Sequence, residues 1–132
     1  MSWPRIVIVD DDTSVRLMLR HLIERINGEV IGEAEDGLAG LNAVELLQPD
    51  VLIMDVSMPM MGGFETARQV HATMPGLAII FVSQHADQPY VDEAFRCGAK
   101  GYVLKQAAAT ELSDAIHAIM QGDLFRSPRI NH

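Results

Sequence analysis

The sequence predicts an α/β protein in which helices cover both faces of a parallel β-sheet. Three observations carry this prediction: short apolar runs recur along the chain, amphipathic segments of helical period lie between them, and the connections are short. Strands and helices alternate five times within 132 residues, which is the size of one domain. We therefore expect a single doubly wound domain around one hydrophobic core.

The five predicted strands are short, and the first, from Ile6 to Val9, is continuously β-branched. Such a run is typical of a strand buried on both faces, because a strand with one wet face alternates apolar and polar residues. The predicted strands span residues 6–9, 29–34, 51–54, 78–82 and 101–104.

The predicted helices lie after these strands. In the first, apolar residues from Val15 to Ile26 recur at i, i+3, i+4, i+7, i+8 and i+11, the stripe of an amphipathic helix. The five apolar stripes cover residues 15–26, 38–47, 64–74, 91–95 and 112–119. A glycine or proline follows each of them, as is usual at helix ends: Gly28, Pro49, Pro75, Gly98 and Gly122.

We interpret this alternation as a flavodoxin-like fold, a five-stranded parallel sheet of order 2-1-3-4-5 with five helices. In such sheets ligands bind beyond the carboxyl ends of the strands, at the switch point between the first and third strands. The residues that follow those strands are thus the first candidates for a functional site.

Composition excludes several classes of function. With a formal net charge of −8 and a pI near 4.9, the chain lacks the clustered Lys and Arg that nucleic-acid binding needs, so we expect no nucleic acid on this segment. Cys97 is the only cysteine, so no internal disulfide can form, and a cytoplasmic location is the simplest expectation. No apolar run is long enough for a membrane span or a signal peptide.

Charged and polar residues follow four of the predicted strands. Asp10-Asp11-Asp12 comes after the first, Asp55 after the third, Ser83 after the fourth and Lys105 after the fifth. Like charges gathered on one edge repel, and a hard divalent cation is the natural compensator. We predict a site for Mg²⁺ or Mn²⁺ formed by Asp10, Asp11, Asp55 and the backbone carbonyl of Ser57.

The residues at this edge predict phosphoryl chemistry. Asp55 can act as a carboxylate nucleophile on phosphorus, while the cation and Lys105 neutralise the phosphoryl oxygens and Ser83 donates a hydrogen bond to one of them. The glycines match neither a P-loop nor a dinucleotide fingerprint, so we expect the phosphoryl donor to be another molecule.

These residues resemble the receiver domains of two-component response regulators over essentially the whole chain. The resemblance rests on the acidic pair after the first strand, Met-Asp-Val-Ser-Met-Pro-Met-Met-Gly-Gly at residues 54–63, Ser83, and Gly-Tyr-Val-Leu-Lys at residues 101–105. It implies a receiver domain over residues 1–122, with Asp55 as phosphoacceptor, Asp10 and Asp11 as metal ligands, Lys105 as phosphate ligand, and Ser83 and Tyr102 as switch residues. A sensor histidine kinase is the implied phosphoryl donor.

The segment from Ala94 to Lys105 is similar to the branch with a C-terminal LuxR/NarL-type helix-turn-helix domain. Residues 123–132 would then be a tail or the start of a linker to an absent DNA-binding output domain, and a stand-alone receiver is the alternative. The resemblance also implies a homodimer on phosphorylation, formed through the face of the fourth helix, fifth strand and fifth helix.

Two departures from the family pattern matter. Gln106 stands where most receivers have a cis proline, and a cis bond before a non-proline residue costs about 3–4 kcal/mol, so we expect a trans peptide and a different loop. Asp12 is a third acid, which we expect to face solvent at the start of the first helix.

Two other functions remain open at this stage. A phosphohydrolase of the haloacid dehalogenase type would use Asp10 as its nucleophile, within Asp10-Asp11-Asp12-Thr13-Ser14, but it leaves Asp55 unexplained. A pseudo-receiver, acting only as a protein-interaction module, would require a site that cannot be phosphorylated.

Overall fold

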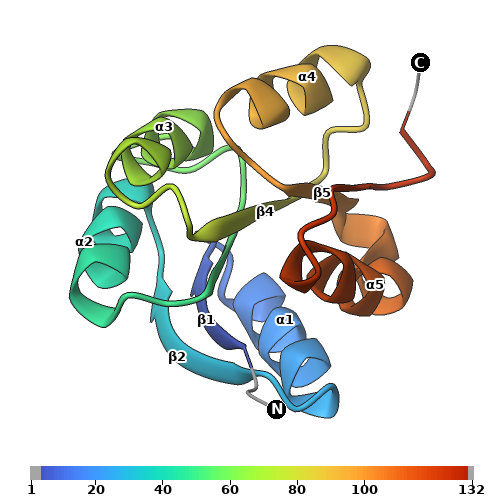
Figure 1. Ribbon diagram of the computed structural model, residues 1–132, viewed down its shortest axis with the longest axis horizontal. Helices are drawn as coiled ribbons and strands as arrows, with labels where there is room; N and C mark the ends of the chain where they lie inside the picture. The colour runs from blue at the N-terminus through green and yellow to red at the C-terminus, as the bar shows by residue number, and fades with distance from the viewer. Residues whose placement is uncertain (1–3, 131–132) are drawn as a thin grey trace.

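A computed structural model describes residues 4–130 as a parallel β-sheet between two layers of helices (Figure 1). The strands are β1 (Arg5–Val9), β2 (Glu29–Ala34), β3 (Val51–Met54), β4 (Ala78–Ser83), β5 (Gly101–Leu104) and β6 (Phe125–Arg126). The helices are α1 (Thr13–Arg25), α2 (Gly37–Leu47), α3 (Gly63–Thr73), α4 (Gln88–Arg96) and α5 (Ala108–Met120), with a 3₁₀ turn, η1 (Lys105–Ala107), before α5.

The strand order is β2-β1-β3-β4-β5-β6, and every neighbouring pair is parallel. The predicted fold class, five helices and order 2-1-3-4-5 are confirmed. The prediction of five strands misses β6, which adds to the sheet beside β5. A strand of two residues has no alternation that sequence reasoning could detect.

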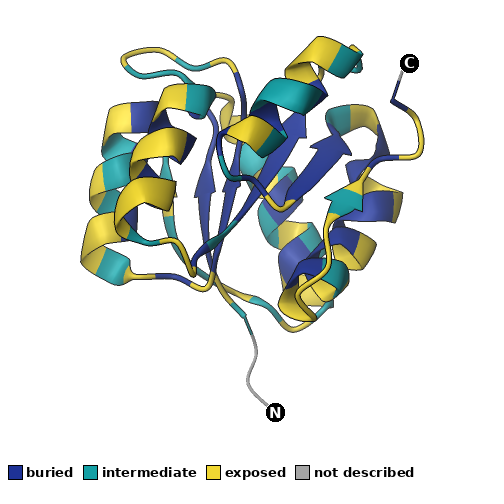
Figure 2. Ribbon diagram, turned by 45° about the horizontal axis from the view of Figure 1, so that its top comes forward, coloured by how far each residue is buried: buried dark blue, intermediate teal, exposed yellow. Residues whose placement is uncertain are grey.

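Side chains of alternate strand residues divide the core into two layers. Ile6 and Ile8 of β1 pack with α1 and α5, whereas Val7 and Val9 face the side of α2, α3 and α4. All four are fully buried, because each strand residue points to the face opposite its neighbour's and helices cover both faces. Figure 2 shows the result, with buried strands between helices whose outer sides are exposed.

Local interactions place the loops beside the carboxyl edge of the sheet. Asp12 is the N-cap of α1, where its Oδ1 accepts hydrogen bonds from the backbone N–H groups of Ser14 (2.9 Å) and Val15 (3.4 Å). At the start of α2, a Cβ on Gly37 would lie 1.9 Å from the carbonyl oxygen of Met61. Only glycine permits this close approach, which holds the β3–α3 loop against α2.

Candidate functional site

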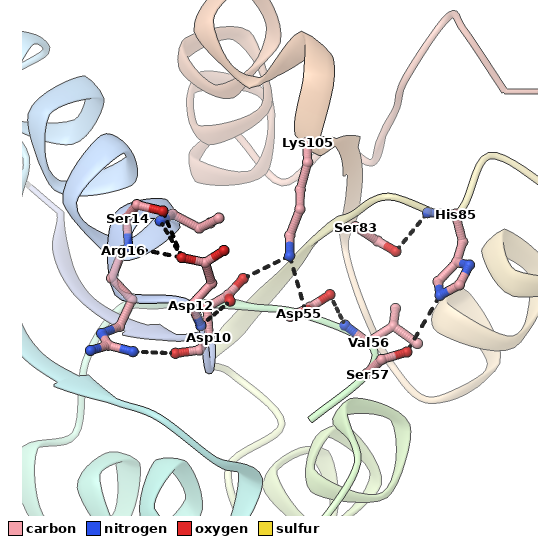
Figure 3. Close-up of polar contacts among 11 residues, drawn as sticks. Asp10, Asp12, Ser14, Arg16, Asp55, Val56, Ser57, Ser83, His85 and Lys105 are labelled. Carbon is pink, nitrogen blue, oxygen red and sulfur yellow. Dashed lines mark hydrogen bonds and ion pairs between the residues drawn. The ribbon is translucent and has the colours of Figure 1, made fainter. Parts of the chain in front are cut away.

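Four predicted site residues from four strands meet at one edge of the sheet (Figure 3). Asp10 follows β1, Asp55 follows β3, Ser83 is the last residue of β4, and Lys105 follows β5. Because the strands are parallel, their carboxyl ends lie side by side, so residues up to 95 positions apart in the chain come together.

The Lys105 ammonium lies between two buried carboxylates. Its Nζ is 3.1 Å from Asp55 Oδ2, to which it donates a hydrogen bond, and 3.1 Å from Asp10 Oδ2. The second contact is an ion pair whose angles do not make a hydrogen bond. Asp10 is 1% exposed and Asp55 6%, so this cluster has little screening by solvent.

Burial changes the proton affinities of this cluster. Loss of solvation raises the pKa of Asp10, despite the lowering effect of the hydrogen bond from the Asp12 backbone. Burial alone would lower the pKa of Lys105, but its contacts with the Asp55 and Asp10 carboxylates outweigh that effect, so the pKa of Lys105 is raised. The Lys105 ammonium is thus firmly protonated, whereas the negative charge of an ionised Asp10 is only partly balanced.

The oxygen atoms of this edge suit a hard divalent cation. Asp10, Asp11 and Asp55 each offer a carboxylate oxygen, and the three oxygens lie within 4.8 Å of one another. Asp10 Oδ2 accepts no hydrogen bond from any of residues 4–130. Three carboxylates face one ammonium, so charge and donor type both fit Mg²⁺ or Mn²⁺. Ser57 lies on the adjacent loop, and its carbonyl as a ligand stays a prediction.

Backbone contacts fix the Asp55 carboxylate. The Val56 N–H donates a hydrogen bond of 2.8 Å to Asp55 Oδ1, which leaves Oδ2 directed at Lys105 (Figure 3). A Cβ on Gly63 would lie 2.2 Å from the Asp55 carbonyl oxygen, so glycine is needed where α3 begins behind the acid. Asp55 is thereby presented with one oxygen free of backbone donors.

A second group of residues connects this pocket to α4. Ser83 Oγ accepts a hydrogen bond of 3.0 Å from the His85 N–H, and the Tyr102 hydroxyl donates one of 2.7 Å to the His85 carbonyl. The His85 ring stacks on Tyr90 of α4 with centroids 4.0 Å apart, and its Nε2 is 3.4 Å from Ser57 Oγ. His85 therefore contacts the β3–α3 loop, β5 and α4 at once.

The position of Tyr102 bears on its predicted role as a switch. Its side chain is fully buried, and burial raises its pKa. The side chain is therefore turned into the domain in this structure. The role of Tyr102 as a switch residue stays a prediction. The observation relevant to that role is the contact of Tyr102 with the loop that follows Ser83.

Sequence reasoning missed two contributors to this region. It gave no role to His85, whose ring is only partly exposed and contacts Ser57 and Tyr90. It also passed over Arg16, whose guanidinium donates to the Asp10 carbonyl oxygen. His85 follows Ser83 by two residues, which was the available signal; Arg16 had none, since its contact depends on the turn into α1.

Residues 6–117 match the response regulator receiver domain. The chain belongs to this family. It is 33% identical over 129 residues to the transcriptional regulatory protein DegU of Brevibacillus brevis, covering 97% of the chain and 55% of DegU. The chain thus spans about half the length of that relative.

Solved structures of receiver domains superpose closely on this one. A two-component response regulator of the LuxR family from Aurantimonas has a TM-score of 0.93 and 36% identity, over 98% of this chain and 93% of that one. The isolated REC domain of RcsB from Salmonella enterica serovar Typhimurium, solved with the phosphomimetic BeF3-, has a TM-score of 0.90 and 29% identity, over 98% and 96%. The predicted resemblance to response regulators is confirmed.

Two remaining expectations concern this receiver domain as a whole. Residues 4–130 contain no cis peptide bond, so the Lys105–Gln106 bond is trans, as expected, and η1 occupies this loop. Within the same residues, none of the helices combines the length and apolar character that a membrane crossing needs.

Proposed function

We propose that this receiver domain accepts a phosphoryl group on Asp55 with the help of Mg²⁺ or Mn²⁺. One observation carries the proposal: two buried carboxylates, Asp10 and Asp55, share the single ammonium of Lys105 at 3.1 Å each. This excess of negative charge costs free energy in the fold, and a cation together with a phosphoryl group would use all three side chains.

The proposed donor is a phosphohistidine of a sensor histidine kinase. Asp55 Oδ2 attacks phosphorus, an O–P bond forms, the P–N bond breaks, and the departing imidazole takes a proton from solvent. Hydrolysis later returns the carboxylate and inorganic phosphate. Val56 N–H fixes Oδ1, so the other oxygen is presented to the donor.

Asp10, Asp11, Asp55 and the Ser57 carbonyl would hold the metal ion, which neutralises phosphoryl charge when bound. Lys105 neutralises the remaining charge, and it must leave its present position between Asp10 and Asp55 to do so. Its long, partly exposed side chain, 21% accessible, permits this movement.

The proposed output is a change at the face of α4, β5 and α5. Ser83 would move toward the phosphoryl group to donate its hydroxyl hydrogen, and that movement would disturb the hydrogen bond that Ser83 accepts from His85. His85 contacts both Tyr102 and Tyr90, so the change reaches β5 and α4. The acyl phosphate carries about two negative charges in place of the single charge of the carboxylate, a change that can bias two conformations.

Relatives named as transcriptional regulators support a role in transcription for a longer protein containing this domain. We propose a DNA-binding output domain beyond the present chain, no nucleic-acid binding by the receiver itself, a cytoplasmic location and a homodimer on phosphorylation. The net charge of −8 supports the second point.

The test is intact mass after incubation with acetyl phosphate and Mg²⁺. The wild type should gain one phosphoryl group, Asp55→Asn none, and Asp10→Asn little, because it lacks a metal ligand. Asp12→Asn is the matched control, since Asp12 caps α1 and should label like the wild type. Donor turnover that persists in Asp55→Asn and vanishes in Asp10→Asn would instead support the phosphohydrolase. A wild type that never reacts would support the pseudo-receiver.

A further inference from the structure

The chain after α5 crosses the edge of the sheet and packs on the face proposed for output (Figure 1). β6 pairs with β5, with Gly101 opposite Phe125 and Tyr102 opposite Arg126. The Phe125 N–H donates to the Lys100 carbonyl at 2.9 Å, and the Ser127 N–H donates to the Tyr102 carbonyl at 2.9 Å. This segment therefore covers backbone groups of β5 that would otherwise form an open sheet edge.

Side chains of the segment contact the helices on both sides of β5. The Arg126 guanidinium lies over the Phe95 ring of α4, 5.0 Å from its centroid. Arg129 Nε lies 4.0 Å from Oε2 of Glu111, a buried carboxylate on α5. Ile130 is only 6% exposed and belongs to the apolar cluster that includes residues of α4. Residues 125–130 thus tie α4 and α5 together across β5.

This segment is connected to the phosphoacceptor pocket through Tyr102. The Tyr102 carbonyl accepts from Ser127, and its hydroxyl donates to the His85 carbonyl, while the His85 N–H donates to Ser83. A shift of Ser83 toward a phosphoryl group would move this chain of bonds. A shift of α4 would also move Phe95 away from Arg126 and open the cluster that holds Ile130.

We propose that residues 125–130 form an intramolecular strap that closes the α4–β5–α5 face and is released when Asp55 is phosphorylated. The inference rests on the function proposed above and adds a regulatory contact to it. Strap release exposes the apolar site of Ile130 together with the β5 edge. The strap thereby converts a change in the pocket into a change at the C-terminal end of the domain.

Hydrogen exchange of peptides covering residues 123–130, with and without beryllofluoride and Mg²⁺, tests the proposal. The amides of Phe125 and Ser127 should be protected in the untreated protein, and beryllofluoride should speed their exchange at least about tenfold. Intact mass after acetyl phosphate treatment is recorded on the same preparation. If Asp55 takes no phosphoryl group, the proposed function fails and the strap falls with it. If Asp55 is labelled but exchange is unchanged, the strap alone is overturned.

A pair of variants tests the strap without phosphorylation. Ile130→Asp places a charge in the apolar cluster and should give fast exchange before beryllofluoride is added, with no further increase after it. Leu124→Asp is the matched control, because Leu124 is 64% exposed and precedes the strap, so it should behave like the wild type. Slow exchange in Ile130→Asp would overturn the proposal.

Discussion

Two clusters of charged side chains in this domain differ in how well their charges balance. On the surface between α1 and β2, Arg16 and Arg20 pair with Glu33, and Arg20 also lies 3.7 Å from Glu24. These two cations face two carboxylates in contact with water. In the pocket, Lys105 is the only cation among residues 4–130 that forms an ion pair with the buried Asp10 and Asp55, and the exposed Asp11 carboxylate lies beside them.

The two clusters differ in what they contribute: the surface ion pairs stabilise the fold slightly, whereas the pocket charges serve the proposed function. The surface cluster is neutral and solvated, so each ion pair contributes little to stability, and substituting one of its residues should cost little. The pocket holds an uncompensated charge where solvent cannot screen it, which a fold alone would not require. We interpret the excess charge as the part of the domain that serves the proposed phosphoryl chemistry.

The largest expected effect is the loss of Lys105. Without metal, Lys105→Met leaves Asp10 and Asp55 buried without a cation, and it should lower the free energy of unfolding by about 3 kcal/mol. The matched surface change, Arg20→Met, should lower it by about 0–1 kcal/mol. Urea unfolding in EDTA measures both, and equal losses would remove the distinction between the clusters.

Neutralising Asp10 should instead raise the free energy of unfolding. Asp10→Asn keeps the shape of the side chain and removes a poorly compensated charge, so it should raise metal-free stability at pH 7 by about 1–2 kcal/mol. Because burial raises the pKa of Asp10, the folded state binds this proton more tightly than the unfolded state. The advantage of the variant should therefore shrink as pH falls from 7 through the raised pKa toward 3.8.

Asp12 gives the opposite pH dependence as a control. Hydrogen bonds from Ser14 lower the pKa of Asp12, so its contribution to stability is present above 3.8 and is lost as pH falls through the lower folded-state pKa. The advantage of wild type over Asp12→Asn should follow that course. Parallel pH profiles for Asp10→Asn and Asp12→Asn would contradict the environments assigned to the two acids.

Addition of Mg²⁺ should also distinguish the pocket from the surface cluster. At a tenfold excess over its dissociation constant, an ion that binds only the folded state raises stability by about 1.4 kcal/mol. Wild type should show such a gain in thermal unfolding, and Asp10→Asn should show little. Arg20→Met should respond like the wild type, and an equal gain in all three proteins would place the ion elsewhere.

The smallest effect concerns the helix that begins behind Asp55. Asp12 caps α1 with its carboxylate, but Gly62 starts α3 without a side-chain cap. Its φ of −69° suits any residue, and a Cβ there would meet only the Val56 carbonyl oxygen, at 3.9 Å. Gly62→Asn should therefore raise stability by about 0.5–1 kcal/mol in urea unfolding. A loss of stability would show that the loop needs glycine for another reason.

The features predicted from the sequence were those with local signals. Periodic apolar residues predicted the strands and helices, and their alternation predicted the doubly wound fold with its strand order. The parallel arrangement predicted that Asp10, Asp55 and Lys105 would meet. The strap was missed because Phe125–Arg126 is too short for a strand pattern. The role of His85 was missed because its contacts with Ser57 and Tyr90 come from two other elements. Such contacts depend on packing, which no spacing in the sequence encodes.

The identity of the carboxylate that takes the phosphoryl group decides between the receiver and the phosphohydrolase. Borohydride reduces an acyl phosphate to an alcohol, so treatment after acetyl phosphate and Mg²⁺ would convert a phosphorylated aspartate into homoserine. Tandem mass spectrometry of peptides covering Asp10 and Asp55 then identifies the site. We predict homoserine at position 55 and unchanged aspartate at position 10. Homoserine at position 10, with position 55 unchanged, would contradict this prediction.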